Sequence, residues 1–149
     1  MKNALIVISL FCSFISHSQW TYETVNNGFD DPYRIAYTKE MNGAILKLEN
    51  VEGSVFFYIQ GSYTCEDYPM VEVICVVGGE NKKYTFFATT SEDKTVVFIT
   101  DDLANSGMLT DFKNATSIKI RINETYCDTE IFSYNMSKSS SAYTFIINQ

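Results

Sequence analysis

Histidine is nearly absent from this 149-residue chain, whose only imidazole is His17. His17 lies in an N-terminal segment that we predict to be removed, so the mature protein would have no histidine. That absence excludes the Ser-His-Asp and Cys-His catalytic arrangements, in which imidazole carries the proton, and it removes the commonest zinc ligand. The sequence accordingly predicts no catalytic residue, no cofactor and no metal site.

Long apolar runs are also lacking. The longest, Ala4 to Ile15, falls short of the roughly 20 apolar residues that a membrane-spanning helix needs. It follows Lys2 and precedes small residues that end at Ser18, which is the pattern of a secretory signal peptide. We predict cleavage between Ser18 and Gln19, export to the periplasm or the cell exterior, and no stable membrane insertion after cleavage.

Basic residues are scarce in the predicted mature domain, residues 19–149. Loss of the signal peptide, residues 1–18, leaves ten Lys and Arg against eighteen Asp and Glu, a net charge near −8. Nucleic acid and anionic membranes are poor partners for such a chain, because both carry negative charge. About 131 residues suffice for one domain with one hydrophobic core.

Short segments rich in β-branched and aromatic residues, separated by turn residues, predict strands along most of this domain. Met70 to Val77 and Tyr84 to Thr89 flank Gly78-Gly79, whose glycines can adopt the positive φ of a hairpin turn. Both faces of Ser54 to Gln60 are apolar, which predicts a central strand covered on both sides. The other predicted strands are Tyr33 to Thr38, Ala44 to Leu48, Lys94 to Thr100, Thr116 to Asn123, Glu130 to Met136 and Tyr143 to Ile147.

Helical features occur in one segment, Asp101 to Asn114, which offers Asp101 or Asp102 as N-cap and an imperfect apolar face. Ser139 to Ser141 is expected to be a turn between the last two strands. Together these elements predict an all-β fold, an antiparallel β-sandwich or flattened barrel of about eight to ten short strands with one short helix.

Cysteine pairing is expected in an oxidising compartment, where three cysteines would remain after Cys12 leaves with the signal peptide. Cys75 lies on the apolar face of a predicted strand, where a thiol packs as a small hydrophobe. We therefore predict a disulfide between Cys65 and Cys127, with Cys75 as a free buried thiol. A cross-hairpin bond between Cys65 and Cys75 is the alternative.

Two patterns with catalytic potential lack the structural context that their chemistry needs. Ser91 to Lys94 matches the S-x-x-K string of penicillin-binding enzymes, but it lies in a predicted turn and not at the start of a helix. Adjacent carboxylates, which are candidates for glycan hydrolysis or Ca²⁺ binding, point to opposite sides of an extended chain. Turn and capping roles are expected for these pairs, which are Asp30-Asp31, Glu66-Asp67, Glu92-Asp93 and Asp101-Asp102.

Several short motifs follow one another along the mature chain. They are Trp20, Asp30 to Ile35, Gly61-x-Tyr63-x-Cys65, Met108-Leu109-x-x-Phe112-Lys113-x-Ala115, Ile118 to Arg121, Cys127, Phe132-x-Tyr134 and Ser139-Ser140-x-Ala142. Their order resembles that of small exported β-sandwich proteins of Gram-negative bacteria, some of them found beside type VI secretion genes. The resemblance implies a sandwich fold and the Cys65 to Cys127 link, and it implies no catalytic residue.

These observations favour a secreted or periplasmic binding or accessory protein without enzymatic activity, which acts on an unidentified protein or another envelope component. Two alternatives stay open: a small histidine-independent hydrolase that uses carboxylates on glycans, and an envelope inhibitor or effector-neutralising protein. Two carboxylates about 5 to 10 Å apart in a cleft would favour the hydrolase. An exposed apolar patch would favour a protein partner.

Overall fold

The computed structural model describes residues 20–26, 28, 31–40, 43–99, 103 and 106–148. In these residues nine strands form one sheet, accompanied by two short helices. The predicted signal peptide and its cleavage point, between Ser18 and Gln19, lie outside the described residues. None of the helices in the described ranges is long and apolar enough to cross a membrane.

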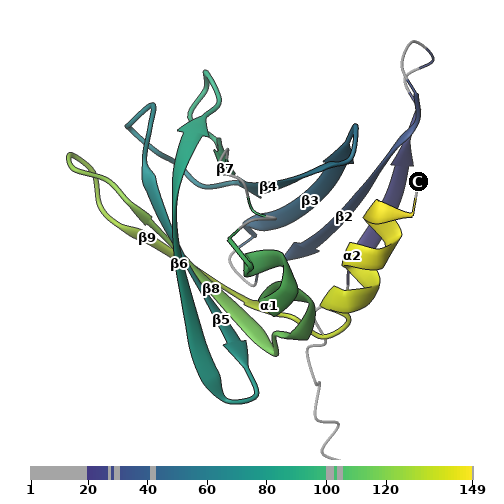
Figure 1. Ribbon diagram of the computed structural model, residues 1–149. Helices are drawn as coiled ribbons and strands as arrows, with labels where there is room; N and C mark the ends of the chain where they lie inside the picture. Colours follow the sequence, from purple (N-terminus) through teal and green to yellow (C-terminus); the bar gives the residue numbers. More distant parts are fainter. Residues whose placement is uncertain are drawn as a thin grey trace, which may run out of the picture.

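The sheet is antiparallel throughout, with strand order β1-β2-β3-β4-β7-β6-β5-β8-β9. The long strand β6 pairs with β5 over most of its length and with β7 over its last three residues. The sheet bends there, so that its two halves face each other (Figure 1). This is the all-β, sandwich-like fold that the sequence predicts. The strands are β1 (Thr21–Val25), β2 (Tyr33–Lys39), β3 (Ile45–Val51), β4 (Ser54–Gln60), β5 (Met70–Val77), β6 (Glu80–Thr90), β7 (Val96–Ile99), β8 (Ser117–Asn123) and β9 (Glu130–Asn135).

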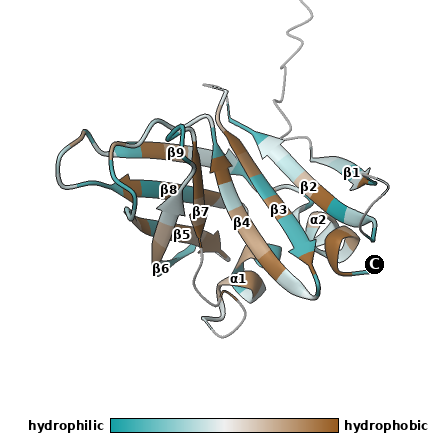
Figure 2. Cartoon of the chain, turned by 90° about the horizontal axis from the view of Figure 1, so that it is seen from above, coloured by the Kyte–Doolittle hydropathy of each residue, from teal (hydrophilic) through white to brown (hydrophobic). Residues whose placement is uncertain are grey.

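The hydrophobic core lies between the two halves and is built by side chains that alternate along each strand. On β8, Ile118, Ile120 and Ile122 are buried, whereas Lys119 and Arg121 are exposed. The same alternation is visible as bands of different hydropathy along the strands in Figure 2. Removing these apolar side chains from water supplies the main driving force for closing the two halves on each other.

Strand β4 is central in its half, between β3 and β7, as predicted. Phe57 and Ile59 are buried on the face toward the core, but Phe56 and Tyr58 on the other face are only half-buried. The prediction that both faces are covered is therefore wrong for the outer face.

The first helix, α1 (Met108–Asn114), is shorter than the predicted segment Asp101 to Asn114. It begins after Gly107, whose φ of 77° is left-handed and so cannot continue a right-handed helix toward the N-terminus. The predicted caps Asp101 and Asp102 lie outside the described residues. The buried face of α1 consists of Met108, Leu109 and Phe112.

A second helix, α2 (Ser139–Ile147), replaces two predicted elements. The prediction of a strand from Tyr143 to Ile147 is wrong, and so is that of a turn at Ser139 to Ser141. Both segments belong to α2, and its buried residues Ala142 and Ile146 are four positions apart, as on one face of a helix. Both helices lie on the concave side of the bent sheet (Figure 1).

Contacts from distant strands hold α2 in place. The guanidinium of Arg34 on β2 donates to the carbonyls of Phe145 and Asn148 at the end of the helix, where a positive charge is favourable. Asn50 on β3 donates to the carbonyl of Ile146 at 3.0 Å. These contacts satisfy carbonyls that the last turn of a helix leaves unpaired.

Candidate functional site

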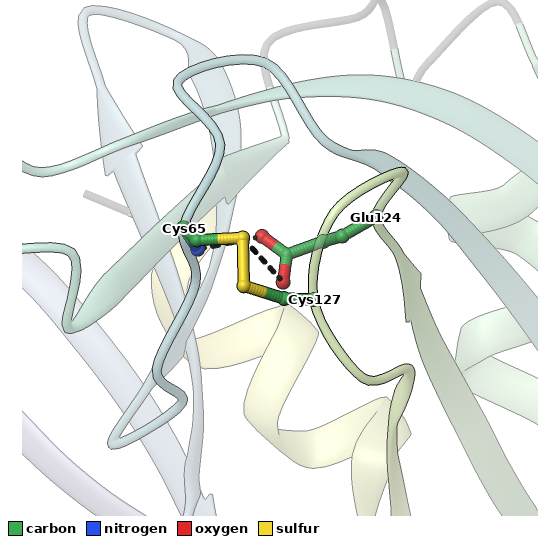
Figure 3. A group of neighbouring side chains, drawn as sticks. All are labelled: Cys65, Glu124 and Cys127. Carbon is green, nitrogen blue, oxygen red and sulfur yellow. Dashed lines mark hydrogen bonds between the residues drawn. A yellow bond between two sulfur atoms is a disulfide. The ribbon is translucent and has the colours of Figure 1, made fainter.

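A disulfide between Cys65 and Cys127 joins the loop that crosses from one half of the sheet to the other with a loop of the second half, which confirms the predicted pairing. Cys65 lies in the loop between β4 and β5, and Cys127 lies in the loop between β8 and β9 (Figure 3). Their Cα atoms are 6.3 Å apart and 62 positions separate them in the sequence. The bond therefore ties the crossover loop to the β8–β9 loop at one end of the fold.

The third cysteine, Cys75, is free and buried on the core face of β5, so the alternative bond to Cys65 is not formed. Burial raises the pKa of the Cys75 thiol to about 12, and the charge of Asp111 adds to the shift. The thiol is therefore protonated at neutral pH. It packs as a small apolar group, as the sequence predicts.

Two glutamates hold the same two loops together reciprocally. Glu124 Oε1 accepts the backbone N–H of Cys65 at 2.9 Å and that of Glu66 at 3.2 Å. In return, Glu66 Oε1 accepts the N–H of Thr125 and, at 3.3 Å, that of Tyr126. Each loop thus supplies a carboxylate to backbone donors of the other loop, and hydrogen bonds to an ionised acceptor are stronger than neutral ones.

The second oxygen of Glu124, Oε2, lies 3.9 Å from Cys65 Sγ (Figure 3). A disulfide sulfur carries no proton, so this contact is electrostatic. One ligand atom each from Cys65, Glu124 and Cys127 lies within 4.8 Å of the others. The two sulfurs are bonded to each other, however, and are not the thiolates that bind metal ions.

Replacing Glu124 with Gln is expected to make the disulfide easier to reduce. Gln keeps an oxygen that can accept the two backbone N–H groups, but it lacks the negative charge. In the unmodified protein that charge repels an attacking thiolate and disfavours the thiolate that Cys65 becomes when it leaves. We expect the rate constant for reduction by dithiothreitol to rise roughly threefold to tenfold at low ionic strength. Alkylation of the released thiols, sampled over time, measures this rate.

The matched control for this change is Glu52→Gln. Glu52 is exposed in the turn at the far end of β4, so this variant removes the same charge at a distance from the sulfur atoms. Its reduction rate should equal that of the unmodified protein. Equal rates in the Glu124 and Glu52 variants would show that the carboxylate does not protect the bond.

Beside the disulfide, six residues line an open hollow of about 600 Å³: Tyr63, Thr125, Tyr126, Cys127, Asp128 and Glu130. Tyr63 and Tyr126 are 70% and 88% exposed. Glu130 Oε2 accepts the backbone N–H of Tyr63 at 3.3 Å. Burial raises the pKa of Glu130 above its ordinary value; the N–H of Tyr63 opposes this shift and the charge of Glu124 adds to it.

Exposed apolar side chains concentrate at this same end of the molecule. Of the nine large apolar side chains exposed in the described ranges, five lie in these two loops or at the adjoining ends of β5 and β9, and a sixth, Phe87, lies within β6 opposite the first residue of β5. Met70 pairs with Phe87 across β5 and β6, and with Asn123, which directly precedes Glu124. We name these six the loop-end surface: Tyr63, Tyr68, Met70, Phe87, Tyr126 and Ile131.

Neither the hollow nor the loop-end surface was predicted from the sequence. Tyr63 and Tyr126 stand two residues and one residue before the paired cysteines, and this proximity to the disulfide was the available signal. Asp128 and Glu130 were not among the adjacent carboxylate pairs. The backbone of the two loops brings these four side chains together.

The residues with catalytic potential in the sequence have structural roles where they are described. Ser91 Oγ donates to Asp93 Oδ1 at 2.6 Å inside the turn between β6 and β7. Lys94 donates to the carboxylate of Asp67, so it does not pair with the serine as S-x-x-K chemistry requires. Glu66 accepts backbone N–H groups, as expected of a capping residue. These N–H groups belong to Thr125 and Tyr126 in the other loop.

No family model matches the chain, and no curated protein and no solved structure matches it. Its class is therefore defined by the fold and the site alone. It is an all-β protein in which a disulfide and two glutamates join two loops at one end of the sheet. Tyrosine and carboxylate side chains line a hollow there.

Proposed function

We propose that this protein is an exported binding protein without enzymatic activity, and that its loop-end surface contacts a protein partner of the cell envelope. The concentration at one end of six of the nine large apolar side chains that are exposed in the described part of the chain carries this proposal. Apolar side chains gathered on an exposed surface mark interaction sites, and Tyr, Phe and Met are enriched at protein interfaces. The disulfide and the signal-like N-terminal segment support export, since disulfides persist in oxidising compartments.

The rigidity of the two loops supports the same proposal. The disulfide, the two glutamates and the bond between Tyr63 N–H and Glu130 fix the backbone on which the exposed tyrosines stand. A surface that is ordered before binding loses little conformational entropy when a partner docks. Tyrosine also offers a large contact area with few rotatable bonds.

Replacing Tyr126 with Ala tests the proposed surface. The mature protein with its disulfide intact is first used to capture partners from an envelope fraction, and a captured protein is then purified for affinity measurements. We expect Tyr126→Ala to weaken this affinity by roughly tenfold to a hundredfold, because aromatic side chains often carry much of the binding energy. Its midpoint of urea unfolding should stay unchanged, since the side chain is 88% exposed.

Tyr22→Ala is the matched control, since Tyr22 is another exposed tyrosine, on β1 at the opposite edge of the sheet from β9. It should bind like the unmodified protein. Equal affinities of the two alanine variants would contradict the proposed surface. A captured enzyme or toxin whose activity falls on binding would identify the protein as an envelope inhibitor.

A second candidate function, hydrolysis of glycans, is favoured by one observation. Asp128 and Glu130 line the same hollow, and the raised pKa of Glu130 favours the protonated form that a general acid needs. Release of reducing ends from envelope glycans, lost in Glu130→Gln, would favour this function over binding.

A further inference from the structure

The hollow beside the disulfide has an unbalanced negative charge. Asp128 and Glu130 line it, Glu124 is close enough to affect the pKa of Glu130, and no lining residue is basic. Five ion pairs join side chains in the described part of the chain, and none of them includes these three carboxylates. The nearby Lys94 is engaged with Asp67.

The aromatic rings of the hollow have the chemistry that attracts cations. The face of a tyrosine ring is electron-rich and draws ammonium and guanidinium groups. Elsewhere this fold already places cations over aromatic rings, with Lys47 5.3 Å from the centre of Tyr58 and Lys113 4.8 Å from that of Tyr143. None of the cation contacts recorded among the described residues involves Tyr63 or Tyr126.

The backbone around the hollow is held in place before any ligand arrives. Cys127 is fixed by the disulfide, and the N–H groups of Thr125 and Tyr126 are fixed by Glu66. Glu130 is held by the N–H of Tyr63. A volume of about 600 Å³ lies within the range of ligand sites, roughly 300 to 1,000 Å³, so it can hold one long side chain together with parts of its neighbours.

We infer that the hollow binds a basic segment of the protein partner, with a lysine or arginine side chain between Tyr63 and Tyr126 and its charge against Asp128 and Glu130. The inference rests on the proposed function and adds the chemistry of the partner. Charge complementarity favours this occupant over a neutral sugar, because a sugar would stack on the rings but would leave the carboxylates without a counter-charge.

Fluorescence anisotropy with a labelled hexa-arginine peptide, at low ionic strength, tests this inference on the mature protein with its disulfide intact. The double variant Asp128→Asn/Glu130→Gln is expected to bind the peptide at least roughly tenfold more weakly than the unmodified protein, and Tyr126→Ala several-fold more weakly. A hexa-glutamate peptide should not bind. Both variants change exposed or half-exposed side chains, and urea unfolding verifies that they fold.

The double variant Glu23→Gln/Glu52→Gln is the matched control, because it removes two charges from β1 and from the turn between β3 and β4. Its affinity for hexa-arginine should be within about twofold of the unmodified protein. Equal losses in the two double variants would overturn the inference, since net charge and not the hollow would then attract the peptide. Capture of an envelope partner without any hexa-arginine binding would overturn the inference alone, whereas failure to capture any partner would overturn the proposed function.

Discussion

Replacing Phe112 with Ala is expected to lower the free energy of unfolding by roughly 3 to 5 kcal/mol, the range for deleting a buried phenylalanine ring. Phe112 on α1 is fully buried, and its ring meets those of Trp20 and Phe57 edge-to-face at centroid distances of 5.9 and 5.4 Å. The variant would leave a cavity where the helix meets β4. Urea unfolding followed by the fluorescence of Trp20, the only tryptophan, measures the loss.

Phe87→Ala provides a matched control, because the same chemical change is made at a side chain that is 70% exposed on the outer face of β6. Its free energy of unfolding should change by no more than about 0.5 kcal/mol. Phe87 belongs to the loop-end surface, so this variant should lose partner affinity while it keeps its stability. A loss below about 1 kcal/mol in Phe112→Ala would contradict the packing of α1 against the core.

Local patterns were sufficient to predict much of the sheet. The hairpin of β5 and β6 was predicted from Gly78-Gly79 between two apolar runs, and both glycines have positive φ, of 59° and 87°. The buried face of β8 was predicted from isoleucines at every second position. In both cases the determining interactions are within a few residues of one another, so the sequence pattern contains them.

The errors occur where distant contacts decide the structure. Tyr143 to Ile147 is a run of aromatic and β-branched residues that favours a strand by propensity. Arg34 and Asn50, on strands about one hundred positions earlier, bind the carbonyls at the end of α2 and stabilise the helix instead. Propensity differences amount to about 1 kcal/mol or less per residue, so a few such tertiary contacts are enough to override them.

At the candidate site, too, some features could be predicted from the sequence and others could not. The pairing of Cys65 with Cys127 was predictable because the third cysteine lay on an apolar strand face. The contacts of Glu66 and Glu124 cross between loops 58 to 60 positions apart, and no local pattern indicates them. The hollow follows from those contacts, so it could be recognised only after the two loops were placed side by side.

Replacing Cys65 and Cys127 together with Ser is expected to lower the free energy of unfolding by about 4 kcal/mol. The bond closes a loop with a sequence separation of 62, and without it the unfolded chain regains the conformational freedom that the link removes. Denaturant unfolding of the variant measures this loss. The unmodified protein with its disulfide reduced is the matched control, and it should show the same loss.

The two glutamates allow the effect of the disulfide on stability to be separated from its effect on the binding surface. Glu66 and Glu124 hold the same loops through four backbone hydrogen bonds that do not need the bond between the sulfurs. At temperatures where the serine variant is folded, its affinity for the partner should therefore lie within roughly threefold of the unmodified protein. A loss of affinity as large as that of Tyr126→Ala would mean that the glutamates do not maintain the conformation of the loops. The covalent link would then be what orders the loops for binding.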